Sequence, residues 1–556
     1  MARAPLRGCL IAALLQMAAA SETRAAKPVC IDNATIGELR QVLASGEVTA
    51  TGLVQAYLAR IAAYDRAGSH LNAVREVNPD AEAIAARSDG TDPAQRRPLE
   101  GIPILVKDNI ATADAQHTTA GSLALEGAKA KADATVVKLL RQAGAVILGK
   151  ANLTEFANIL AIDMPGGYSS LGGQIKNPYA PELDDKGVPI VPPGGSSSGS
   201  AVAVAAGLAA AAIGTETSGS LLSPAGQNGV VTVKPTVGLI SRAGIIPIAH
   251  SQDTAGPLTR TVHDAALLLN VLAAPDPLDP ATTELQRPAD YTSFLDRDGL
   301  KGARIGLPSD PSDPANDVYY STLSPRAAAV MRDVAAVLER EGATIVRVNI
   351  PTEGWIGGPG TEMAILNRNP ESATRNQPAR RPIVFIYELK HDLNLYLRDW
   401  ATGTGMMSLA DIVAFNNEHA DRALRFGQDI FLAAEATRGN LSELEYVSAR
   451  QMDLRASRTL GLDTYIDEYR LDAVLFPGAA GAAIAAKAGY PSVQVPAGFV
   501  SGIRDKETPD YPYGATFTGR AWSEPTLLRL AYAFEQATSA RRPPPDLPSL
   551  DSACAR

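Results

Sequence analysis

The chain has few cysteines, few aromatic residues and no dense run of basic residues. No Cys/His spacing is typical of a zinc site. The lack of a Lys/Arg-rich run, with a formal net charge of −9, argues against nucleic acid as the main partner. Beyond the N-terminus, no segment is long and apolar enough to span a membrane. With 46% hydrophobic and 20% charged residues, the composition is that of a folded protein.

The N-terminus has the pattern of an export signal. Arg3 and Arg7 precede a short apolar run that ends in three alanines at Ala20. The run is shorter than the roughly 18 residues that a membrane-spanning helix needs. The pattern predicts a secretory signal peptide over residues 1–26, cleaved after Ala20 or Ala26, and hence a periplasmic or secreted bacterial protein.

The three cysteines lie near the ends of the chain. Cys9 would leave with the signal peptide, so Cys30 and Cys554 remain in the mature protein. In an oxidising compartment these two thiols could form one disulfide that joins the termini. The alternative is two unrelated thiols, because sequence spacing says nothing about their distance.

Helical and extended patterns alternate along the chain. Short apolar runs typical of strands occur at 102–109, 145–150, 210–216, 302–308, 343–350, 471–478 and 491–499. Helical patterns occupy 35–46, 49–65, 133–144, 152–158, 201–210, 324–342 and 524–538. This alternation predicts an α/β sheet covered by helices on both faces. Residues 351–420 break the rhythm, and we interpret them as an inserted helical and loop region that shapes a site.

Three polar stretches stand out against this apolar background. Lys107 ends an apolar run, where burial would lower its pKa and leave a neutral amine able to act as a base. The loop 192–200 and the stretch 214–229 are both rich in glycine and hydroxyl groups. Ser196 and Ser220 are separated by one predicted helix and one strand, so they should lie at the same end of the fold. A hydroxyl can bridge a nucleophile and a base, because it both donates and accepts a hydrogen bond.

These stretches resemble a known family. GGSSSGSAVAVAAGLAAAAIGTETSGSLLSPAGQNGVVTVKPTVGLIS at 194–241 resembles the signature of the amidase signature family, and GIPILVKDN at 101–109 resembles its lysine motif. The resemblance covers about residues 36–540. It implies an α/β/α sandwich around a large mixed sheet, in a single domain at 30–545 that is followed by a tail at 546–556.

The resemblance also implies a Ser-cis-Ser-Lys triad. Matching by position gives Ser220 as the nucleophile, Ser196 after a cis peptide bond as the bridging serine, and Lys107 as the base. No metal or organic cofactor takes part in this chemistry. The oxyanion hole would consist of backbone N–H groups in the loop before and at the nucleophile, those of Thr217, Ser218, Gly219 and Ser220.

The branch of the family is suggested by a departure from its commonest pattern. Many members carry an arginine two residues after the nucleophile, where this chain has Leu222. This loss and the motif KPTVGLISRAGIIPI resemble the bacterial peptide amidases, which remove the C-terminal amide of peptides. We therefore expect an exported amidohydrolase that acts on peptide or small-molecule amides, as a monomer or homodimer.

Several further residues receive predicted roles around the triad. Glu216 is expected to anchor the oxyanion loop, Gln252 and Asp253 to brace loops, and Lys150 to pair with Glu155. The residues predicted to contact substrate are Asn158, Ser170 and Ser197.

Other functions compete with this interpretation. Residues 195–199 match G-x-S-x-G, the nucleophile elbow of α/β-hydrolases, which would make Ser197 the nucleophile of an esterase. That elbow needs a core strand before it, and only a proline-broken stretch precedes it. A component of a tRNA-dependent amidotransferase would share the triad but act inside the cell with partners. A non-catalytic family member would be expected to lack triad residues, and all three are present.

Overall fold

A computed structural model describes residues 29–352, 363–366, 379–502, 508–550 and 554–555. The predicted signal peptide at 1–26 and part of the predicted insertion at 351–420 lie outside these residues. In the part of the chain that is described, no helix combines the length and apolar character needed to cross a membrane.

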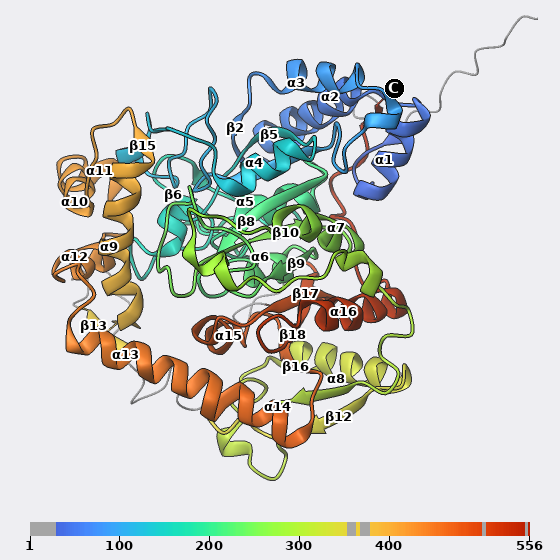
Figure 1. The fold of residues 1–556 in the computed structure, drawn as a ribbon, viewed down its shortest axis with the longest axis vertical. Coiled ribbons are helices and arrows are strands. Elements are labelled where there is room, and N and C mark those ends of the chain that lie inside the picture. Colours follow the sequence, from blue (N-terminus) through green and yellow to red (C-terminus); the bar gives the residue numbers. More distant parts are fainter. Residues whose placement is uncertain (1–28, 353–362, 367–378, 503–507, 551–553, 556) are drawn as a thin grey trace, which may run out of the picture.

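The centre of the fold is one mixed sheet of 11 strands, in the order β12-β11-β16-β18-β17-β9-β10-β8-β3-β5-β2 (Figure 1). The parallel sets β12-β11-β16 and β8-β3-β5 flank an antiparallel middle, and the edge strand β2 pairs antiparallel with β5. The strands are β2 (Val74–Val77), β3 (Pro103–Lys107), β5 (Val146–Ala151), β8 (Ala211–Glu216), β9 (Val231–Lys234), β10 (Thr254–Thr259), β11 (Arg304–Leu307), β12 (Thr344–Arg347), β16 (Ala473–Pro477), β17 (Ser492–Val500) and β18 (Tyr511–Thr518).

Two groups of helices pack on this sheet. In one group α4, α7, α16 and α8 contact one another in succession, and in the other α5 contacts α6. The helices near the sheet are α1 (Ile36–Ser45), α2 (Ala50–Arg60), α3 (Ala81–Asp89), α4 (Thr135–Gln142), α5 (Ser198–Ala205), α6 (Leu222–Gln227), α7 (Val262–Leu272), α8 (Pro325–Arg340), α15 (Ala482–Ala488) and α16 (Glu524–Thr538). The expected α/β fold around a large mixed sheet is confirmed.

A second set of helices lies along one side of the molecule and below it in Figure 1. These are α9 (Ile383–Asp399), α10 (Leu409–Glu418), α11 (Ala420–Ala423), α12 (Asp429–Glu435), α13 (Leu444–Leu454) and α14 (Asp463–Tyr469). The first two of them, α9 and α10, belong to the region 351–420 that the sequence marked as an insertion. Buried apolar residues of α9, α10 and α12 form a hydrophobic cluster of their own with residues of the 120–164 region.

Short strand pairs complete the structure. They are β1 (Val29–Cys30) with β19 (Cys554–Ala555), β4 (Lys129–Ala130) with β15 (Ala401–Thr402), β6 (Tyr168–Ser169) with β7 (Gly173–Gln174), and β13 (Met363–Leu366) with β14 (Ala379–Pro382). The first pair sets Cys30 directly opposite Cys554. Opposed residues of an antiparallel pair lie within the Cα separation that a disulfide needs. The register is therefore compatible with the predicted bond, which stays a prediction.

Helix ends follow the capping signals in the sequence. Thr35 caps α1 in a capping box with Glu38, and the helix ends at Gly46, whose φ of 73° suits glycine. Ser324 caps α8, with Pro325 in its first turn. These local signals placed both helices correctly.

Close packing explains why α5 consists of small residues. Every residue of this helix is buried, and a Cβ on Gly199 would lie 2.3 Å from the carbonyl oxygen of Asn152 and 2.4 Å from that of Ala73. Only glycine permits such close backbone approach. As a result, α5 packs tightly beneath β3 and β8 and fixes the loop that precedes it.

Candidate active site

Lys107 is the last residue of β3, a strand in which every residue is buried between β8 and β5. Its Nζ lies 2.8 Å from Ser196 Oγ, 3.0 Å from Ser197 Oγ and 2.8 Å from Thr215 Oγ1. Burial lowers the pKa of Lys107 to about 7, although the negative charges of Asp253 and Glu216 oppose the shift. The amine can therefore be neutral near physiological pH, as the sequence predicted for a buried lysine.

Ser196 lies in the loop that leads into α5, and it follows a cis peptide bond from Gly195. This is the bond that the family resemblance implied. The Ser196 carbonyl accepts a hydrogen bond from the Thr154 amide at 3.1 Å, and the side chain has no exposed surface. The next amide, that of Ser197, donates to the Ser220 carbonyl at 3.1 Å. That backbone bond holds the two serine-bearing loops together, at the same end of the sheet.

Ser220 lies in the loop between β8 and α6, which turns at Gly219 with φ of 85°. Its residue exposure is 7%, whereas Lys107 and Ser196 have none. Ser220 is thus the member of the predicted triad that has accessible surface.

The carboxylate of Glu216 holds this loop from within. Its Oε2 accepts hydrogen bonds from the amides of Leu221 at 2.7 Å and Leu222 at 3.0 Å. Glu216 therefore bridges the two ends of the segment 217–220. Its predicted role as the anchor of this loop is confirmed.

Asp253 supports the same loop from outside. It accepts a hydrogen bond from the Thr217 hydroxyl and two more from the amides of Ile248 at 2.9 Å and Ala249 at 3.0 Å. Gln252 donates to the Thr217 carbonyl at 3.5 Å. The predicted loop-bracing roles are confirmed for both residues. Burial raises the pKa of Asp253 to about 6.

A cavity of about 310 Å³ adjoins this loop. Thr215 and Thr217 contribute to its wall, together with the apolar segment 245–248 and residues of α9. Lys107, Ser196 and Ser220 are not among its lining residues. Thr215, which hydrogen-bonds to Lys107, does line it, so the cavity adjoins the lysine–serine cluster.

The residues predicted to contact substrate lie in different environments. Ser197 is fully buried, donates to the Thr215 carbonyl and belongs to the lysine network. Ser170 is partly exposed, and its hydroxyl accepts from the Leu123 amide at 3.2 Å. Asn158 is half-buried in a turn. A contact with substrate stays a prediction for all three residues.

Two local predictions in this region were wrong. The segment 152–158 is not an α-helix, because Phe156, Ala157 and Asn158 all adopt positive φ angles. Nor do Lys150 and Glu155 form a pair: Lys150 donates to the Ile110 carbonyl and the Thr118 hydroxyl, while Glu155 accepts from the Ser170 amide. Tertiary contacts override helix propensity and sequence proximity here.

Sequence reasoning missed Thr215 and Asn109. Thr215 Oγ1 lies 2.8 Å from Lys107 Nζ and 3.0 Å from Asn109 Nδ2, so both side chains belong to the lysine network. The available signal was position: Asn109 follows Lys107 by two residues, and Thr215 lies in the same signature stretch as Ser220.

Comparison with known proteins agrees with this architecture. A family model described as Amidase matches residues 52–356. The chain belongs to the amidase signature family. It is 40% identical over 546 residues to a probable amidase of Arabidopsis thaliana, covering 96% of this chain and 95% of that protein. It is also 34% identical to a putative amidase of Schizosaccharomyces pombe, covering 93% of this chain and 87% of that protein.

A solved structure extends the comparison to the fold. The native peptide amidase of Stenotrophomonas maltophilia shares 42% identity, with a TM-score of 0.78, over 92% of this chain and 98% of that one. This chain is therefore, like the rest of its family, a hydrolase of amide C–N bonds.

The α/β-hydrolase alternative does not suit this amidase. A nucleophile elbow needs a strand immediately before its serine. The residues between β7 and α5 are all described and contain no strand apart from isolated bridges. Ser197, the serine in question, is buried and bonded to Lys107 and Thr215.

Proposed function

We propose that this protein is an exported peptide amidase that removes the C-terminal amide of peptides, with Ser220 as nucleophile. The observation that carries the proposal is the Lys107–Ser196 hydrogen bond of 2.8 Å, next to the loop that presents Ser220. The 42% identity to a peptide amidase supports the substrate class. Export rests on the signal-peptide pattern of residues 1–26.

The reaction begins with proton transfer through the two serines. Neutral Lys107 accepts a proton from Ser196 Oγ as Ser196 takes the proton of Ser220 Oγ. The Ser220 oxygen then bonds to the amide carbonyl carbon, and the carbonyl π electrons move onto its oxygen. Because Lys107 and Ser196 are fully buried, water does not compete for these hydrogen bonds.

The resulting oxyanion lies where backbone N–H groups of the segment 217–220 would bind it. Glu216 and Asp253 fix the two sides of this segment before the substrate arrives. Fixed donors of this kind cost no reorganisation during the reaction, and one of them contributes about 10²–10³ in rate.

Collapse of the intermediate completes the acylation. Ser196 gives its proton to the leaving nitrogen and recovers one from Lys107, so the C–N bond breaks and ammonia departs. Water then attacks the acyl-enzyme by the same relay, giving the free acid and restoring the Ser220 hydroxyl. Each proton taken by Lys107 is returned within its half-reaction.

The residue two positions after the nucleophile supports the hypothesis that the terminus of the substrate is uncharged. Leu222 is fully buried at the start of α6, where many family members carry arginine. A C-terminally amidated peptide has no terminal carboxylate, so it requires no cation there. This is the argument for peptide amides over substrates that carry a free carboxylate near the scissile bond.

The test measures ammonia release from a C-terminally amidated dipeptide by the wild type and three serine variants. We expect Ser220→Ala to lose at least a thousandfold in kcat, as expected for loss of a nucleophile. Ser223→Ala, three residues away on α6, serves as the matched control and should retain activity. If Ser220→Ala keeps the wild-type rate and Ser197→Ala does not, the nucleophile is misassigned.

A substrate panel then tests the substrate class. Amidated peptides are compared with free glutamine, a short aliphatic amide, an acyl anilide and a methyl ester, at equal concentration. We expect the highest kcat/KM for the amidated peptides. Preference for glutamine would favour an activity like that of the tRNA-dependent amidotransferases instead.

A further inference from the structure

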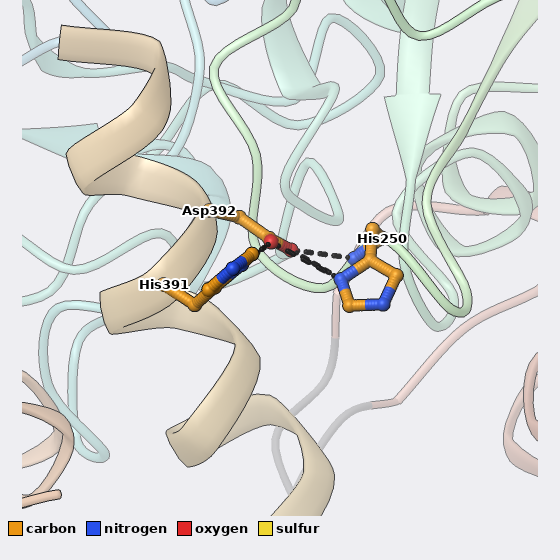
Figure 2. Close-up of side chains that lie close together, drawn as sticks. All are labelled: His250, His391 and Asp392. Carbon is orange, nitrogen blue, oxygen red and sulfur yellow. Dashed lines mark hydrogen bonds and ion pairs between the residues drawn. The ribbon is translucent and has the colours of Figure 1, made fainter. Parts of the chain in front are cut away.

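Two histidines far apart in the sequence converge on one carboxylate outside the triad. His250 lies in the loop before β10, and His391 and Asp392 lie on α9 (Figure 2). Asp392 Oδ2 lies 2.8 Å from His250 Nδ1, and Asp392 Oδ1 lies 2.7 Å from His391 Nδ1. One possible ligand atom from each of the three residues lies within 4.8 Å of the others.

We propose that these three side chains form a binding site for one divalent ion of the zinc class, which joins α9 to the 248–253 loop. Two imidazoles and one carboxylate are ligands that suit Zn²⁺, Ni²⁺ or Cu²⁺ more than Mg²⁺ or Ca²⁺. The proposal does not depend on the proposed peptide amidase activity.

The site has the layout of an open metal centre. Asp392 forms its nearly buried floor, while the side chains of His250 and His391 are 46% and 35% exposed. Ions can therefore enter from solvent, and water can complete the coordination. Metal–ligand bonds of about 2.1 Å place tetrahedral ligands about 3.4 Å apart, so ligand atoms as far apart as 4.8 Å must approach by up to about 1.4 Å. The Nδ1–carboxylate pairs at 2.7–2.8 Å must open slightly.

Surrounding groups hold the ligands in place. The Asp392 carboxylate also accepts from the His250 amide at 2.9 Å, which fixes the loop to the helix. Buried Glu388 lies behind Asp392, with its Oε2 3.5 Å from His250 Nδ1. Glu388 also accepts hydrogen bonds from the Ser251 amide and the Tyr446 hydroxyl. The His250 carbonyl accepts from Arg242, whose charge is paired with Asp279. Two carboxylates therefore lie beside the rings. Arg242 is paired with Asp279, and a second cation, Arg450, acts on Glu388.

Protons occupy the positions that the ion would take. Each imidazole that bonds to Asp392 through Nδ1 carries a proton there. A ring that binds metal through Nδ1 carries its proton on Nε2 instead. Each neutral ring therefore changes tautomer when the ion binds, and the ion replaces the imidazole–carboxylate hydrogen bonds.

An ion at this site would act on the loop that supports the oxyanion segment. Asp253 follows His250 by three residues, and its carboxylate accepts a hydrogen bond from the Thr217 hydroxyl. Linking His250 to α9 restricts this loop, so ion binding should raise the thermal stability of the protein. It should also change the rate of amide hydrolysis.

The experiment titrates Zn²⁺ into the full mature chain, freed of affinity tag and of chelator, by isothermal calorimetry at pH 7.5. We expect one ion per chain, a higher Tm with Zn²⁺, and no binding of Mg²⁺. H391Q should weaken Zn²⁺ binding by about tenfold or more. H117Q is the matched control, because His117 pairs with the carboxylate of Glu76 at 3.0 Å in the same way but belongs to no such cluster among the described residues.

Three results would overturn the proposal. The first is no Zn²⁺ binding by the wild type up to millimolar concentration. The second is equal affinity of H391Q and the wild type, and the third is an equal loss of affinity in H117Q. The Tm of each variant without metal is measured as well. H391Q should match the wild type there, so that a loss of binding is not a loss of fold.

Discussion

The acid limb of the pH–rate profile tests the role of Lys107 most directly. The pKa of this lysine is about 7 instead of the ordinary 10.5. At pH 7 about half of the protein then carries the neutral amine, compared with about one molecule in 3,000 for an ordinary lysine. Burial at the end of β3 therefore raises the concentration of the active base by about three orders of magnitude.

The expected profile follows from this value. Since Lys107 must be neutral, kcat/KM should fall as pH decreases through about 7, reaching about one tenth of its plateau at pH 6 and one hundredth at pH 5. Above pH 8 the base is fully neutral, so the rate should stay high into the alkaline range. The assay is ammonia release from an amidated dipeptide at substrate concentrations well below KM.

A neighbouring carboxylate offers a second perturbation of the same pKa. Asp253 stabilises the charged form of Lys107, so Asp253→Asn should lower the lysine pKa and move the acid limb to lower pH. Because Asp253 also holds Thr217, the plateau should fall too. Asp310→Asn, which changes a solvent-facing carboxylate after β11, should leave both unchanged. The reasoning would be refuted if kcat/KM of the wild type fell only at pH 4–5. It would also be refuted if Asp253→Asn moved the acid limb to higher pH.

Three further predictions concern stability, and a fourth concerns the disulfide. Gly199→Ala should destabilise the fold by roughly 1–3 kcal/mol or more, since its Cβ would meet backbone oxygens at 2.3 and 2.4 Å. Gly37→Ala, in an open position on α1, should stabilise by about 0.5–1 kcal/mol in urea denaturation. Lys234 is buried, its Nζ has no partner among the described residues, and its pKa is lowered to about 8. Lys234→Met should therefore raise the free energy of unfolding more at pH 7, where the native lysine is charged, than at pH 10, where it is neutral. Non-reducing peptide mapping should recover Cys30 joined to Cys554, and finding both thiols free would exclude the disulfide.

The sequence by itself determined the family, the alternating α/β order and the positions of Lys107, Ser196 and Ser220. These features depend on residues close together in the chain. Helix caps such as Thr35 and Ser324 bond within three residues, and strands such as β3 show as short apolar runs. Such signals need no knowledge of the partner elements.

Only the tertiary structure decided what the buried polar groups contact. Lys107 contacts Thr215 because β3 and β8 are neighbours in the sheet, although the two residues are 108 positions apart in the chain. The histidine pair meets across 141 residues because α9 packs against the loop before β10. The left-handed turn at Phe156 replaced the predicted helix for the same reason. A buried polar group must satisfy its hydrogen bonds in the folded state, and the partners available there are set by packing, not by distance along the sequence.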